Sequence, residues 1–86
     1  MTTAKDAFLL HLEQPAELVA LSEYDSLWYA IWTRPTNPFR DRPFNVSVFT
    51  YDEALDRLHL MRSSDYDLSM VDAMTLVADL MRGVTI

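Results

Sequence analysis

Residues 68–82, LSMVDAMTLVADLMR, are the stretch that decides the fold. Ten of these 15 residues are apolar, and at about 100° per residue they cover roughly 220° of a helix surface. So wide an apolar arc predicts either the central pillar of a small core or a helix that also meets a partner. Met70, Met74 and Met81 fall in the middle of the arc, and we expect them in the core because methionine fills irregular gaps. Gly83 is expected to end the helix in a left-handed conformation.

The segment before this helix predicts a second helix, over residues 51–62. Thr50 and Glu53 have the Thr-x-x-Glu spacing of a capping box. Asp65 or Asp67 is then expected to cap the C-terminal helix. The buried stripe of the helix over 51–62 would consist of Ala54, Leu55, Leu58 and Met61.

Two earlier segments have the composition of β-strands. Residues 27–34, LWYAIWTR, are aromatic and β-branched, which favours a strand. Residues 44–51 alternate in polarity. We expect the two strands to pair as an antiparallel hairpin across residues 34–43. In the second strand the expected orientation is inward for Phe44, Val46 and Val48, and outward for Asn45 and Ser47.

This hairpin offers two candidate binding elements. Both faces of 27–34 are apolar, so either the strand is central, with elements packed on each side, or its Trp28 and Trp32 face is an exposed recognition surface. The connection between the strands combines arginines with an aromatic side chain, a pairing common at protein interfaces and also suited to single-stranded nucleic acid. The arginine and aromatic residues of this connection are Arg34, Phe39, Arg40 and Arg42.

The N-terminal part predicts one or two helices. Thr3, with Asp6 three residues later, introduces a helix over 4–13. A second short helix is expected over 15–22, with a strand over 17–22 as the alternative. The expected fold is therefore α+β in a single domain of residues 1–86: the hairpin packed against the two C-terminal helices. Because a lone hairpin is marginal, we expect a third strand, a helical cover on both sides, or a dimer that completes the sheet.

Composition narrows the function. The chain has no cysteine, which removes disulfides and cysteine-ligated metals, and it has 13 acidic against seven basic residues, a net charge of −6. We expect a cytoplasmic protein that does not enter a membrane. His11 and His59 lie in no recognisable catalytic or metal-ligand spacing, so no enzyme activity, metal or cofactor is expected. The charge disfavours direct nucleic-acid binding and favours a basic partner.

The leading hypothesis is a non-enzymatic protein-binding module, an acidic inhibitor that docks on a larger basic protein or nucleoprotein complex. In size, acidity and lack of motifs the whole chain is similar to small phage-encoded inhibitors of host defence, including anti-CRISPR proteins. The alternatives are a homodimerising structural domain or small subunit of an assembly, and single-stranded nucleic-acid binding through residues 34–42. The candidate binding residues are Trp28, Trp32, Arg34, Phe39, Arg40, Arg42, Asp52, Glu53, Asp56, Asp72 and Asp79.

Overall fold

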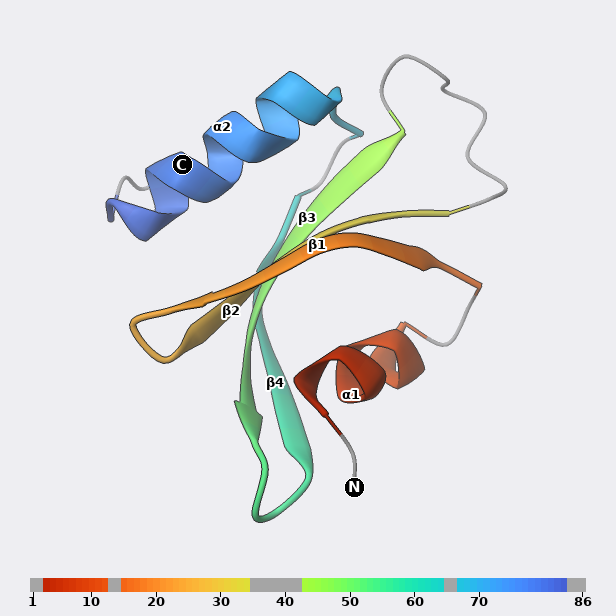
Figure 1. Cartoon of the computed structure of the whole chain (residues 1–86), viewed down its shortest axis with the longest axis vertical. Helices are drawn as coiled ribbons and strands as arrows, with labels where there is room; N and C mark the ends of the chain where they lie inside the picture. The colour runs from red at the N-terminus through yellow and green to blue at the C-terminus, as the bar shows by residue number, and fades with distance from the viewer. Residues whose placement is uncertain (1–2, 13–14, 35–42, 65–66, 84–86) are drawn as a thin grey trace.

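The computed structural model describes residues 3–12, 15–34, 43–64 and 67–83. Within these ranges the chain forms a four-stranded antiparallel sheet and two helices (Figure 1). In chain order the elements are α1 (Ala4–His11), β1 (Glu17–Tyr24), β2 (Leu27–Thr33), β3 (Phe44–Asp52), β4 (Arg57–Ser63) and α2 (Met70–Met81). The predicted α+β class is confirmed, and so are the helices near the two ends.

The sheet is a meander, with strand order β1-β2-β3-β4 and every neighbouring pair antiparallel. The predicted hairpin of β2 and β3 is confirmed, with Trp28 opposite Phe49. The third strand that this hairpin needed is present, and a fourth flanks it. Both outer strands contain an irregularity that inserts one extra residue, Val19 in β1 and Met61 in β4.

Two predicted helices are strands. Residues 17–24 pair with β2, so the helix expected over 15–22 is wrong and the alternative strand holds. The helix expected over 51–62 is also wrong. Asp52 accepts hydrogen bonds from the backbone nitrogens of Ala54 and Leu55, which closes a turn, and Asp56 has a positive φ of 49° that reverses the chain. The residues that follow then pair with β3 as β4.

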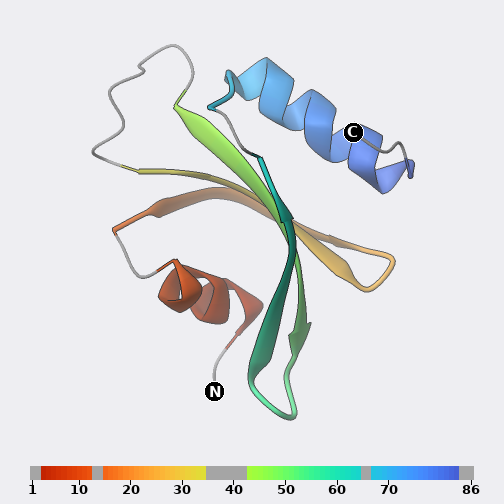
Figure 2. The same ribbon diagram turned by 180° about the vertical axis from the view of Figure 1, so that it is seen from behind.

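The helices cover opposite faces of the sheet (Figures 1 and 2). On one face Phe8 of α1 stacks on Phe49, with ring centroids 4.8 Å apart, beside Trp32 and Ala30. On the other face α2 meets Ile31, Val46 and Leu68 through Ala73, Leu76, Val77 and Leu80. Strand β2 is therefore central and packed on both sides, the first of the two arrangements expected for it. One C-terminal helix covers the sheet instead of two.

The start of α2 and its apolar arc differ from expectation. Ser69, and not Asp67, is the N-cap, because its side chain accepts a hydrogen bond from the backbone nitrogen of Asp72. Asp65 lies outside the described residues. The apolar arc is wider than the sheet can cover: Met74 is 59% exposed, which corrects its placement in the core. Gly83 has the predicted left-handed backbone, with a φ of 81°.

The molecule is a slab measuring 38 × 30 × 17 Å. Both ribbon views look along the shortest axis, with β1 nearest the viewer in Figure 1 and β4 nearest in Figure 2. The thin dimension therefore crosses the sheet from one edge strand to the other, as expected for four strands about 4.8 Å apart. The two broad sides of the slab each present a strand edge.

Candidate protein-binding surface

The two hairpin turns of the meander carry five carboxylates at the same end of the strands, although the twist of the sheet sets the two turns apart (Figure 1). The β1–β2 turn and the β3–β4 turn both lie at the end opposite to the one where β2 stops and β3 starts (Figure 1). Their side chains form what we call the acidic end. It consists of Glu23 and Asp25 at the first turn, and Asp52, Glu53 and Asp56 at the second.

The β1–β2 turn is tight and holds its acid in a fixed place. Asp25 and Ser26 both have positive φ, 51° and 67°, which is the backbone pattern of a two-residue type I′ hairpin turn. Aspartate tolerates this conformation better than most residues. Tyr24, beside the turn, is 54% exposed and supplies an aromatic surface next to the carboxylates.

The β3–β4 turn is held by its own carboxylates. Asp52 Oδ1 lies 3.0 Å from the backbone nitrogen of Ala54 and 3.2 Å from that of Leu55. The hydroxyl of Tyr51 donates to Asp56 Oδ1 at 2.7 Å. That hydrogen bond, followed by desolvation and the negative charges of Asp56, Glu53 and Asp52, raises the pKa of Tyr51 to about 12. The turn therefore presents its charges from an ordered backbone.

Two of the predicted acidic residues lie elsewhere. Asp72 is in the first turn of α2, where the helix dipole favours a negative charge. Asp79 forms an ion pair with Arg82 near the other end of the same helix. The structure therefore groups Asp52, Glu53 and Asp56 but does not bring Asp72 and Asp79 onto either turn.

The two tryptophans belong to the core on the α1 side. Trp32 is 6% exposed, and Trp28 is half-buried and stacks on Phe49 with the ring planes 11° apart. The Trp32 indole nitrogen donates to Ser47 Oγ at 3.0 Å, and Ser47 Oγ lies 2.9 Å from Ser63 Oγ. Ser47, expected to point to solvent, is 1% exposed because α1 covers this face.

Arg34 sits over Trp32, with its guanidinium carbon 4.7 Å from the ring centroid, a cation–π geometry. The structure thus attaches this arginine to the core tryptophan and leaves it half-buried. The other predicted residues of this connection, Phe39, Arg40 and Arg42, lie outside the described residues.

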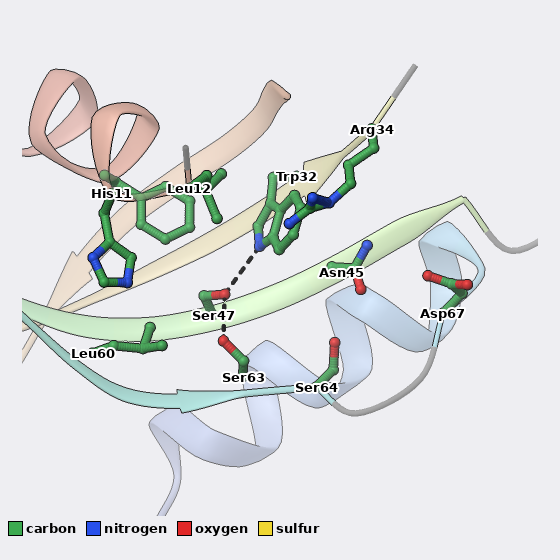
Figure 3. Close-up of a pocket in the computed structure, with 11 residues that line it drawn as sticks. His11, Leu12, Trp32, Arg34, Asn45, Ser47, Leu60, Ser63, Ser64 and Asp67 are labelled. Atoms are coloured by element: carbon green, nitrogen blue, oxygen red, sulfur yellow. Dashed lines mark hydrogen bonds between the residues drawn. The ribbon is translucent and has the colours of Figure 1, made fainter. Parts of the chain in front are cut away.

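A cleft of about 580 Å³ opens beside Trp32, between the C-terminal turn of α1 and the ends of β3 and β4 (Figure 3). His11 and Leu60 lie at one end, and Arg34 and Asp67 at the other. Asn45 and Ser63 line the wall between them. Within the described residues, no group of three or more His, Cys, Asp or Glu side chains is placed to hold a metal ion.

Comparison with known proteins does not assign the chain to a family. No family model matches the sequence, and no curated protein or solved structure matches the chain. In the described part of the chain, neither α1 nor α2 has the length and apolar content of a membrane-crossing helix.

Proposed function

We propose that this chain is a non-enzymatic protein-binding module that docks its acidic end on a basic, nucleic-acid-handling protein and inhibits it. The observation that carries the proposal is the meander, which places Asp52, Glu53 and Asp56 on one hairpin turn and Glu23 and Asp25 on the other turn at the same end of the strands. These residues come from two segments separated by the whole β2–β3 hairpin. Their placement at the same end of the strands is a property of the fold and not of a charged run in the sequence.

The charge of this end suits a surface that normally binds phosphates. Its five carboxylates outnumber the basic side chain of Arg57, which begins β4 beside the second turn, in a chain of net charge −6. A basic groove that attracts the phosphates of a nucleic acid also attracts carboxylates held on ordered turns, and such complementarity speeds association and sets orientation. A protein that occupies the groove in this way prevents nucleic-acid binding.

The acidic end also offers apolar contact. Leu55, at the tip of the β3–β4 turn, is 63% exposed, and Tyr24, at the other turn, is 54% exposed. Protein interfaces typically combine a few apolar or aromatic anchors with a surrounding polar rim. Each of the two exposed side chains can serve as an anchor beside the carboxylates of its own turn.

Amide substitution tests the proposal because it removes charge while keeping the turn. The variant carries Asp52→Asn, Glu53→Gln and Asp56→Asn. An asparagine at position 52 keeps an oxygen for the two backbone donors, and asparagine tolerates the positive φ of position 56. Tagged protein is used to capture partners from a nuclease-treated lysate of the native host. We expect the wild type to retain a basic nucleic-acid-binding protein, and the variant to lose it.

The matched control removes three charges outside the acidic end: Asp6→Asn, Asp72→Asn and Asp79→Asn. It should retain the partner at moderate salt, and high salt should release the partner from the wild type. The purified partner should bind a labelled nucleic acid less tightly when the wild-type protein is added. Equal loss by both variants, or capture that ignores salt, would contradict docking through the acidic end.

A further inference from the structure

The two edge strands present unpaired backbone on the two broad sides of the slab. Strand β1 crosses in front of the other strands in Figure 1, and β4 crosses in front of them in Figure 2. Apolar side chains on these strands are exposed: Val19 by 41%, Leu60 by 38% and Met61 by 54%. An open edge with apolar side chains is a template for pairing with another strand.

The edges carry opposite charge. Strand β1 has Glu17 and Glu23, whereas β4 has Arg57 and Arg62. Pairing β1 with β1, or β4 with β4, brings like charges together, which destabilises a strand pair. Pairing β1 with β4 brings unlike charges together. Charge complementarity therefore selects a second copy of this chain, joined through unlike edges.

The topology allows this pairing without turning the sheet over. Four strands that alternate in direction give β1 and β4 opposite directions. If a second copy is placed along the thin axis, with its β1 beside the β4 of the first, the new pair is antiparallel like all the others. The face covered by α1 in one copy then continues into the α1 face of the next.

One register of the two edges sets unlike charges and leucines opposite one another. Leu18 and Leu21 lie on the α1 face of β1, and Leu58 and Leu60 lie on the same face of β4, as their pairing with neighbouring strands shows. Setting Glu17 opposite Arg62 also sets leucine against leucine on that face. The full alignment is Glu17 with Arg62, Leu18 with Leu60, Ala20 with His59, Leu21 with Leu58, and Ser22 with Arg57.

The irregularities of the two strands agree with this register. Val19 is the extra residue of β1 and Met61 is the extra residue of β4. In the alignment Met61 falls between the first and second pairs and Val19 falls between the second and third, so the two insertions offset each other and the pairs from Ala20 onward stay in register. The two inserted residues flank the Leu18 and Leu60 pair, one on each strand, so the register has the same number of residues on both edges.

We propose that the chain assembles with a second copy of itself by antiparallel pairing of β1 in one copy with β4 in the other. The contact is heterologous, and it produces a continuous eight-stranded sheet in a pair of copies. Because strongly twisted open sheets seldom exceed about ten strands, the dimer is the expected main species. The pairs of this alignment include none of the five carboxylates of the acidic end, and the residues tested below, Glu17 and Arg62, lie outside that end.

The first test is the mass of the purified wild-type chain as a function of concentration, measured by analytical ultracentrifugation. We expect the mass to rise from the 10.0 kDa of one chain toward twice that value, and high salt to weaken the rise. A mass that stays at one chain up to millimolar concentration overturns the proposal without any variant.

Charge reversal then identifies the edges. Glu17→Arg and Arg62→Glu should each raise the dissociation constant about tenfold, because each places like charges opposite one another. The double variant should restore association. Both positions are exposed, so the fold should survive, and circular dichroism checks it. Matched controls with the same charge changes at exposed positions outside the edges, Asp6→Arg and Lys5→Glu, should associate like the wild type.

The pattern of outcomes separates the alternatives. Pairing of β1 with β1 predicts that Arg62→Glu has no effect, and pairing of β4 with β4 predicts the same for Glu17→Arg. Association through the exposed side of α2 leaves both variants unchanged. Any of these results, or a double variant that fails to restore the dimer, contradicts the unlike-edge contact.

Discussion

At the residue scale, Ser47 is the position where alternation in the sequence and burial in the structure disagree. The alternating pattern of 44–51 marks it as an outward residue, yet it is buried beneath α1 and accepts the indole hydrogen bond of Trp32. A signal was present, because a buried tryptophan needs a partner for its N–H group. The sequence could not show which polar residue the adjacent strand places there.

Ser47→Ala should therefore destabilise the fold by about 1–3 kcal/mol, because it leaves the buried Trp32 indole nitrogen without an acceptor. Urea denaturation measures the change. Combining Ser47→Ala with Trp32→Phe removes both hydrogen-bonding groups, so the two losses should be less than additive. Fully additive losses would mean that this hydrogen bond contributes nothing.

Tyr51 predicts a pH dependence. Its pKa is raised from 10.0 to about 12 in the folded chain, chiefly by the hydrogen bond to Asp56. The stabilisation from a raised pKa is fully present below pH 10 and is lost as the pH rises from about 10 to 12. Denaturation followed across this range should show that loss in the wild type. In Tyr51→Phe this part of the pH dependence should vanish, whereas Tyr24→Phe should keep it.

At the scale of elements, the predictions are correct where the apolar residues fit either the helical or the strand repeat. They are wrong where the same residues fit both repeats. The spacing of Leu58 and Met61 fits a helix, but Arg57, Leu58, His59 and Leu60 also alternate as in a strand. Pairing with β3 decides between the two, and a single sequence does not contain that pairing. In β1 the extra residue Val19 interrupts the alternation and hides the strand.

The corrected start of α2 gives a test at this scale. Ser69 accepts a hydrogen bond from the backbone nitrogen of Asp72 at 3.2 Å. Ser69→Ala should lower the free energy of unfolding by about 1 kcal/mol. Ser69→Gly should lower it by only about 0.3 kcal/mol, because glycine is itself tolerated at the N-cap. Thermal denaturation distinguishes them. Equal and negligible losses would show that the cap does not fix the helix start.

At the scale of the whole molecule, the sheet separates two hydrophobic cores, one beneath α1 and one beneath α2. Phe8 is fully buried in the core on the α1 side, where its ring contacts Phe49 and Trp32. A chain of 86 residues is expected to have a total stability of about 4–13 kcal/mol. The cost of truncating this one buried side chain is therefore a large part of the total free energy of unfolding.

Phe8→Ala should cost about 3–5 kcal/mol and bring the protein close to unfolding. Leu10→Ala, in the same helix, changes a side chain that is 75% exposed and should alter stability by less than about 0.5 kcal/mol. Urea denaturation of the two variants compares them. Similar effects would mean that α1 does not anchor the core as the structure places it.

The acidic end shows how the site depended on the fold. Asp52, Glu53 and Asp56 were candidates from the sequence, but there they belonged to the start of a helix. Glu23 and Asp25 were missed, because only the meander brings the first turn to the same end as the second. Charge can be counted from a sequence, whereas its grouping here depended on two strands that resembled helices.

The packing of α1 on strands that follow it in the sequence has a consequence for biosynthesis. This helix leaves the ribosome before the strands that it covers, since it packs against β2, β3 and β4, and β4 ends at Ser63. The nascent chain therefore carries the apolar side of α1, including Phe8, without its native cover until most of the sheet has been translated. Codon-level pauses before residue 63 would prolong that interval, during which the helix is accessible to chaperones.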